Sequence, residues 1–228
     1  MAAPFAYEQP TINASWQALL LHLPTILLIW VISLLFTFIG YGVGTLLGSL
    51  GLLVGPGQLS SDAASGLSLL LNQLGQLPFT ILSSFVGVLF TAVPAMHYET
   101  GNTISLEAAF RELLRRPARY LLAGALFAVI MTIGFLFCVL PGIAVALVMP
   151  VYINKIFNGE EGIVDALRTS FQAVYRSPNT VSFLVVEVCA WMLVILVTVC
   201  TCLVGGIIAG PLATFYVQNT AYRMGILH

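Results

Sequence analysis

The feature that most constrains this chain is an apolar run from Leu121 to Pro150 that contains no charged residue. The run continues to Phe157 with Lys155 as its one charge, and a helix of that length would measure about 55 Å, too long for a single crossing of a bilayer core of about 30 Å. Of all residues 59% are hydrophobic and 7% are charged, whereas soluble domains carry about 25% charged residues. The sequence therefore predicts an all-α, polytopic membrane protein. Its net charge of −1 gives no reason to expect a nucleic-acid partner.

Proline and glycine divide the apolar stretches into six predicted spans. Pro141 and Gly142 interrupt the long run and predict a tight turn there. A loop over Gly55–Gly66 is predicted from its composition, and another turn is predicted near Cys202–Gly206. The six spans then form three hairpins: Pro24–Ser49 with Pro78–Tyr98, Leu121–Leu140 with Gly142–Phe157, and two spans within Thr180–Arg223.

Two short amphipathic helices are predicted between the spans. In Ser105–Tyr120 the apolar residues recur at helical spacing, Glu107 and Glu112 precede arginines by four positions, and Pro117 ends the helix. Asn158–Tyr175 repeats the pattern and ends at Pro178. We interpret both as helices on the membrane surface, where arginines bind anionic headgroups; a solvated helix on a globular protein is the alternative. The candidate lipid-headgroup residues are Arg111, Arg115, Arg116 and Arg119.

The order of these features indicates one membrane domain built from three repeated units, at about 11–101, 102–159 and 160–225. Each unit runs from an amphipathic helix through a membrane hairpin to a polar exit. An even number of spans per unit places all eight Lys and Arg residues on one side, which the positive-inside rule assigns to the cytoplasm together with both termini. The N-terminus lacks the basic start of a signal peptide, so we expect the first span to remain uncleaved.

Several short motifs carry a resemblance to a known group of proteins. They are Leu140-Pro-Gly-Ile143, Asp165-Ala-Leu-Arg-Thr-Ser170 and Gly210-Pro-Leu-Ala-Thr-Phe-Tyr216. With them, most of residues 100–225 resembles bacterial six-helix membrane proteins that are similar to the membrane domain found with glycerophosphoryl diester phosphodiesterases. The resemblance implies a multi-pass protein of the bacterial inner membrane, and that group mostly lacks an assigned activity.

Five glycines share one stripe of the first span and its continuation. Small residues let a second helix approach closely, in the manner of a glycine zipper, so we interpret the stripe as a helix-packing face. The alternative is a flexible gate or a path lined by backbone. The glycines are Gly40, Gly44, Gly48, Gly51 and Gly55.

Few polar residues lie inside the predicted spans. Glu187 is the one charge deep in a span, and we predict that it faces polar groups of the spans ending at Lys155 or Tyr98 because a carboxylate in hydrocarbon is costly. Three roles are open for Glu187: a site for a proton or a cation, an anchor for a partner subunit, and a structural carboxyl. The isolated histidines at positions 22 and 97 are expected to be interfacial or hydrogen-bonded, and the four cysteines to be buried thiols without a metal. The predicted intramembrane polar set is Glu187, Lys155, Asn154 and His97.

No catalytic pair, phosphate-binding loop or cofactor motif is present in the sequence, and the polar segments are too short to fold a catalytic domain. The sequence therefore favours a non-enzymatic integral membrane protein without a cofactor. We expect an accessory or scaffold subunit of a membrane complex, in contact with lipids and with other membrane subunits or copies of itself. The alternative is a small-solute or ion transporter or channel that uses Glu187.

Overall fold

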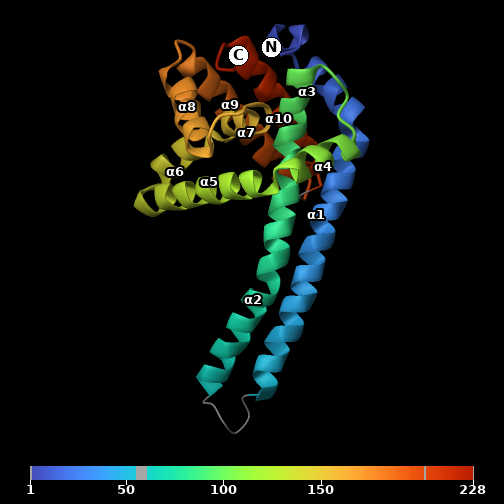
Figure 1. Cartoon of the computed structure of the whole chain (residues 1–228), viewed down its shortest axis with the longest axis vertical. Coiled ribbons are helices and arrows are strands. Elements are labelled where there is room, and N and C mark those ends of the chain that lie inside the picture. Colours follow the sequence, from blue (N-terminus) through green and yellow to red (C-terminus); the bar gives the residue numbers. More distant parts are fainter. Residues whose placement is uncertain (1, 55–60, 203, 228) are drawn as a thin grey trace. The chain divides into compact units, whose positions relative to one another are not determined.

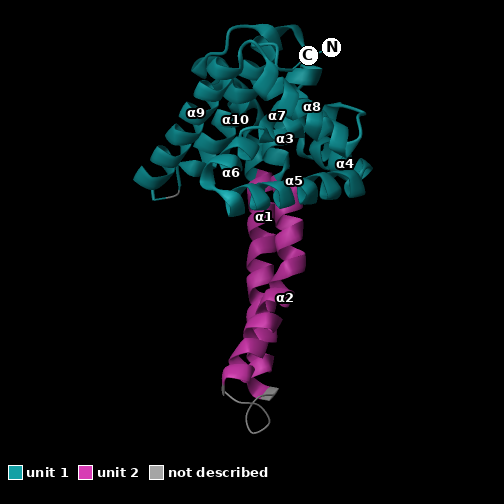
Figure 2. Cartoon of the chain, turned by 90° about the vertical axis from the view of Figure 1, so that its left-hand side faces the viewer, with its two compact units in different colours: residues 1–27, 88–228 teal, residues 28–87 magenta. Residues whose placement is uncertain are grey.

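The computed structural model describes residues 2–54, 61–202 and 204–227, and these residues contain helices but no strand. They group into two compact units (Figure 2). The first contains residues 1–27 and 88–228, and the second contains residues 28–87. Five helices of the described residues are long and apolar enough to cross a membrane: Ile12–Leu53, Asp62–Thr100, Pro117–Phe137, Val139–Asn158 and Thr180–Cys200.

The second unit is formed by two helices. Residues 28–54 of α1 (Ile12–Val54) lie beside α2 (Ser61–Gly87). Pro24 lies inside α1, so it does not open a new helix as the sequence suggested. Of the expected loop, residues 55–60 lie outside the described residues, and residues 61–66 belong to α2. The first turn of α2 contains Asp62, a residue that stabilises a helix N-terminus.

The core of the first unit is formed by α3 (Leu89–Thr100), α7 (Met149–Asn158) and α10 (Gly206–Arg223) (Figure 1). Almost every side chain of α3 and most of those of α7 are buried. A helix that is apolar on all sides is stable only when other elements surround it. The surrounding elements are the 3₁₀ turn η1 (Pro4–Tyr7), the start of α1, α4 (Leu106–Arg115), α5 (Pro117–Phe137), α6 (Val139–Ala146), α8 (Ile163–Arg176) and α9 (Thr180–Cys200).

The turn between α5 and α6 lies at Cys138, three residues before the predicted Pro-Gly turn. Pro141 is accommodated in the first turn of α6. The backbone N–H groups of a first turn have no acceptor within the helix, so a proline there removes no helical hydrogen bond. Glycines permit the close contact of the two helices, since a Cβ on Gly134 would lie 3.1 Å from Gly142 Cα. The turn between α9 and α10 agrees better with the sequence, because α9 ends at Cys200 and α10 begins at Gly206.

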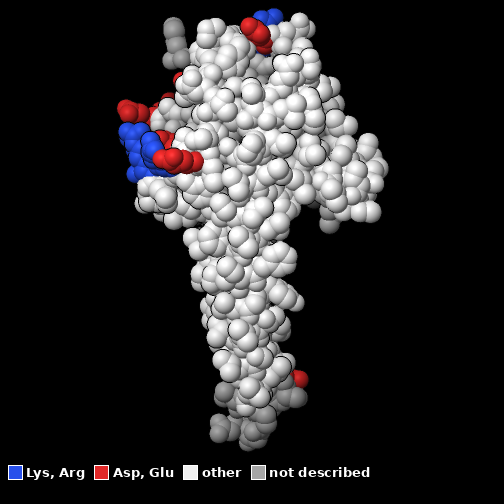
Figure 3. All heavy atoms as spheres, turned by 90° about the vertical axis from the view of Figure 1, so that its right-hand side faces the viewer, with Lys and Arg blue, Asp and Glu red and all other residues white. Residues whose placement is uncertain are grey.

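The expectation of buried cysteines is wrong: Cys138, Cys189, Cys200 and Cys202 are all free and exposed. They lie in or beside apolar helices whose large hydrophobic side chains are also exposed, among them Phe137, Val139 and Val199. Figure 3 shows how few charged side chains appear on one face of the molecule. For a chain with five candidate spans, such a surface suits hydrocarbon better than water.

Candidate functional site

A cluster of polar side chains joins the three core helices of the first unit. The side-chain amide of Asn154 donates to Gln218 Oε1 and to the Tyr222 hydroxyl, both at 3.1 Å. The Tyr222 hydroxyl in turn donates to Glu99 Oε2 at 2.9 Å, and Gln218 Nε2 donates to the Pro150 carbonyl at 2.8 Å. Asn154 and Gln218 are buried, and buried amides are stable only when they are hydrogen-bonded. We call Glu99, Asn154, Gln218 and Tyr222 the amide cluster.

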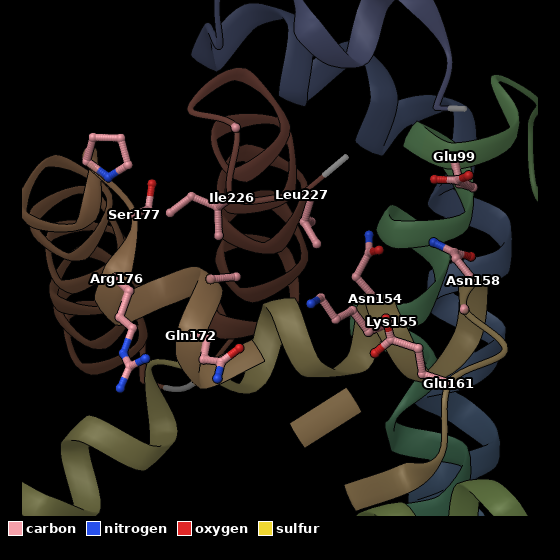
Figure 4. A pocket seen from close by; sticks show the side chains of 14 residues that line it. Glu99, Asn154, Lys155, Asn158, Glu161, Gln172, Arg176, Ser177, Ile226 and Leu227 are labelled. Carbon is pink, nitrogen blue, oxygen red and sulfur yellow. The ribbon is translucent and has the colours of Figure 1, made fainter. Parts of the chain in front are cut away.

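A polar pocket of about 480 Å³ lies beside the amide cluster (Figure 4). Its walls come from the ends of α3 and α7, from the segment between α7 and α8, from the last two turns of α8, and from the C-terminal residues after α10. Pockets of this volume are in the range that accommodates small molecules. Residues that line the pocket include Glu99, Asn154, Lys155, Glu161, Arg176 and Ile226.

The pocket contains charges of both signs. Lys155 is half-buried and Arg176 is exposed, and neither has a carboxylate within 4.0 Å among the described residues. Glu161 is close enough to Lys155 to interact with it electrostatically, and it accepts a hydrogen bond of 2.9 Å from the Thr169 hydroxyl. Figure 4 shows Arg176 and Glu99 at opposite sides of the pocket, with Lys155 and Glu161 between them.

A second buried polar group fastens the segment before α4. His22 Nδ1 donates to the Ala18 carbonyl at 2.8 Å, so its Nε2 accepts the N–H of Ile104 at 3.0 Å. The Thr25 hydroxyl donates to the Ile104 carbonyl at 3.0 Å, which satisfies both backbone groups of that residue. His97 lies edge-on to His22 at 4.7 Å between ring centroids. These contacts give His22 and His97 a positional role, and Ser105 then caps α4.

Glu187 lies in α9 and its side chain is fully buried. Neither carboxylate oxygen has a hydrogen-bond partner among the described residues, although Trp191 lies one turn along the same helix and close to it. Tyr175 of α8 is near enough to interact with the carboxyl. The pKa of the Tyr175 hydroxyl is raised mainly by burial and to a smaller extent by the nearby Glu187 carboxyl. The predicted partners form no hydrogen bond with it: Asn154 bonds within the amide cluster, and His97 bonds to the Asn102 carbonyl.

The four candidate headgroup arginines have different surroundings. Arg111 pairs with Glu107 as the spacing predicted. Glu112 pairs with Arg115 at 3.7 Å and not with Arg116, because Arg116 has left the helical conformation (φ −137°, ψ 59°) and no longer lies one turn away. Arg119 donates to the Gly159 carbonyl at 2.9 Å. Arg116 remains exposed and, among the described residues, has no ion pair within 4.0 Å.

In the second unit, four of the five stripe glycines lie against α2. A Cβ on Gly44 would come within 2.8 Å of the Asn72 carbonyl oxygen, and one on Gly51 within 2.9 Å of Ser68 Cα. Gly40 faces Phe79 and Gly48 faces Asn72 and Ser68. Gly55 lies outside the described residues. The stripe is therefore in contact with a helix of the same chain.

No protein-family model, curated protein or solved structure matches this chain. Sequence reasoning had named Asn154, Lys155 and His97, but it missed the contacts of Gln218 and Tyr222 and the role of Ile104. One signal was available for the amide cluster, since amide side chains near the ends of apolar helices require a partner when they are buried.

Proposed function

We propose that this chain is a non-enzymatic integral membrane protein that serves as an accessory or scaffold subunit of a membrane complex. Its partners are membrane lipids together with other membrane subunits or copies of itself. We further propose that it spans a bacterial inner membrane six times, as three hairpins with surface helices, and belongs with the bacterial six-helix proteins that its motifs resemble. In this arrangement α10 is the sixth span and both termini are cytoplasmic.

The observation that carries the proposal is the apolar outer surface of α9. Only 11% of its most apolar stretch is buried, against 50% for Val139–Asn158. Large side chains such as Trp191, Met192 and Leu196 are exposed along it. In a membrane this surface contacts lipid tails or another helix, and neither contact requires a catalytic group.

The location of the polar groups also supports a scaffold. The amide cluster forms at the last turns of α3, α7 and α10, and its side chains bond to one another. A transport path needs several polar groups that converge near the middle of the membrane. Here the polar bonds instead fix the relative positions of helix ends.

The sixth span of the proposal, α10, is less apolar than the five candidate spans because of polar residues in its second half. Gln218, Asn219 and Thr220 lower its hydropathy, yet all three are buried and so do not contact lipid. Asn219 donates to the Ala6 carbonyl at 2.8 Å. With α10 as a span, every Lys and Arg lies on one side, as the positive-inside rule requires for a cytoplasmic face.

Site-specific photo-crosslinking in native membranes tests the proposal. A photoreactive residue in place of Met192 on the outer surface of α9 should give adducts of discrete, higher protein mass. The same residue in place of the fully buried Phe183 is the matched control and should give no intermolecular adduct. Lipid adducts alone at position 192, and at Trp191 and Leu196 in turn, would contradict the role as a subunit.

A second candidate function is favoured by Glu187, a buried carboxyl that has no hydrogen-bond partner among the described residues and lies in a candidate span. Ionisable groups inside a membrane are costly, and those that occur there commonly mark a proton or ion pathway. In this case the protein conducts protons or cations. Proteoliposomes with a trapped pH indicator and an imposed membrane potential measure the proton flux directly. Flux that Glu187→Gln abolishes while the protein stays folded would support this function, and flux no greater than in protein-free liposomes would exclude proton conduction.

A further inference from the structure

The polar pocket beside the amide cluster has the composition of a binding site. It has about 480 Å³ of space, two cationic and two acidic side chains, and an apolar wall that includes Ile226 and Leu227. The floor is rigid because Asn154 is held by two hydrogen bonds and Tyr222 by its bond to Glu99. A site whose polar groups are fixed before binding loses less entropy when a ligand enters.

Two cations of the pocket, of which Lys155 interacts with Glu161 only at longer range, indicate an anionic group in the ligand. Among the described residues, Lys155 and Arg176 have no carboxylate within 4.0 Å, although both line the same pocket. Guanidinium and ammonium groups bind phosphate through charge-assisted hydrogen bonds. The amide of Gln172, also in the pocket wall, is a further donor.

The two carboxylates indicate a positive group in the same ligand. Glu161 and Glu99 balance the charges of Lys155 and Arg176, so a simple anion would meet repulsion as well as attraction. In Figure 4 Arg176 lies on the opposite side of the pocket from Glu99. A ligand with separated charges of both signs satisfies this arrangement better than a single ion.

The pocket lies at the ends of candidate spans, and this position favours a membrane lipid as the source of the ligand. Glu99 lies at the end of the candidate span Asp62–Thr100, and Lys155 lies in the last turn of Val139–Asn158. Pro178 lines the pocket two residues before the candidate span Thr180–Cys200 begins. Headgroups lie at the ends of spans, with their acyl chains along the apolar helix surfaces.

We propose that this pocket binds a zwitterion that carries a phosphate and an ammonium group. Arg176 and Lys155 bind the phosphate, and Glu161 binds the ammonium. The headgroup of an ethanolamine phospholipid and a free phosphoethanolamine share this chemistry. The inference rests on the proposed membrane location but not on the proposed role as a subunit, so either of these can fail without the other.

The full chain, purified in mild detergent and freed of lipid, is titrated with phosphatidylethanolamine and with phosphatidylglycerol of the same acyl chains, and bound lipid is measured by native mass spectrometry. Free phosphoethanolamine is titrated separately by calorimetry. Phosphatidylethanolamine should bind about tenfold more tightly than phosphatidylglycerol, since the latter lacks the ammonium that makes one charge-assisted contact. Binding of the free compound assigns the site to a soluble ligand, and binding of the lipid alone assigns it to a headgroup.

Variants of the pocket decide whether the binding occurs there. Arg176→Gln should weaken both lipids about tenfold, and Glu161→Gln should weaken phosphatidylethanolamine about fivefold and leave phosphatidylglycerol unchanged. Arg168→Gln, on the exposed surface of the same helix α8 and outside the pocket, is the matched control. Melting of each variant in the same detergent shows that it is folded. Equal binding of both lipids, or equal binding by folded Arg176→Gln and wild type, would overturn the proposal.

Discussion

The two units of this chain hold their helices together by different means. In residues 28–87 the only charged residue is Asp62, and the helices approach through glycines, with Gly75 Cα and Gly44 Cα so close that a Cβ on Gly75 would lie 2.9 Å from the latter. In the first unit the core helices are joined by side-chain hydrogen bonds of the amide cluster. Hydrogen bonds also join α1 and α2, from the Ser68 and Ser83 hydroxyls to backbone carbonyls and between Thr37 and Ser83, but they are exposed or only partly buried. The difference is therefore one of emphasis, between close backbone packing in the second unit and buried side-chain hydrogen bonds in the first.

This difference follows from what the hydrocarbon core permits. Between apolar helices in lipid the hydrophobic effect gives little attraction, so association requires either close backbone contact or hydrogen bonds. Close contact tolerates no added atom at the interface, whereas a hydrogen bond can be lost at a moderate cost. We therefore expect single substitutions to damage the second unit more than the first.

The largest effect is expected from Gly44→Leu in the second unit. Its Cβ would approach the Asn72 carbonyl oxygen to 2.8 Å, and a backbone atom cannot move aside as a flexible side chain can. The cost should be about 2 to 3 kcal/mol of unfolding free energy, measured by SDS titration from mild detergent. Gly42→Leu is the matched control, because a Cβ there meets nothing within 4 Å. Equal stability of the two variants would show that close packing does not hold this unit.

An intermediate effect is expected from Gln218→Met in the first unit. Methionine fills a similar volume but removes the bonds that Gln218 makes to the Asn154 amide and to the Pro150 carbonyl, and Asn154 keeps only its bond to Tyr222. The unfolding free energy should fall by about 1 to 2 kcal/mol in the same titration. The exposed Gln17→Met, on α1, should change it little. A loss as large as that of Gly44→Leu would erase the contrast between the units.

A smaller, local effect is expected from His22→Phe. Phenylalanine retains ring contacts with His97 and Phe215 but cannot accept the N–H of Ile104. The segment before α4 should open more often, by roughly tenfold in amide exchange at Ile104, since a lost buried hydrogen bond is worth about 1 kcal/mol or more. Exchange at Ile104 equal to that of the wild type would show that His22 does not fasten this segment.

The smallest effect is expected from Arg111→Gln. Its pairing with Glu107 lies on the exposed surface of α4, where both side chains contact solvent and salt screens the attraction. Unfolding should occur at nearly the same SDS concentration as for the wild type. A clear loss of stability would mean that surface ion pairs contribute to the first unit beyond its hydrogen bonds.

The coarse fold could be predicted from the sequence, because long apolar stretches without charge leave few alternatives to membrane helices. Exact boundaries could not. Pro141 and Pro24 were both interpreted as breaks, yet a proline in a first turn or within a long membrane helix is tolerated. The pairing of Glu112 failed for a related reason, because four-residue spacing applies only while the backbone remains helical, and Arg116 has already left the helix.

The candidate site was predicted only in part. Asn154 and Lys155 were named for their place at the end of a span, but their neighbours come from helices far apart in the chain. Asn154 and Gln218 are 64 residues apart, and no local pattern links them. The cost of a carboxyl in lipid predicts hydrogen-bond partners for Glu187, yet its side chain is fully buried and has no such partner among the described residues.

The most direct test of the account is the membrane topology, on which both the scaffold role and the pocket's position depend. In a variant without the four native cysteines, single cysteines replace Asp62, Arg116 and Arg176, and intact cells are treated with a maleimide that cannot cross the membrane. The account predicts that the cysteine at position 62 reacts in intact cells, while those at positions 116 and 176 react only after lysis, because the proposed topology places all Lys and Arg residues on the cytoplasmic side. Labelling of position 116 or 176 in intact cells, or of position 62 only after lysis, would contradict it.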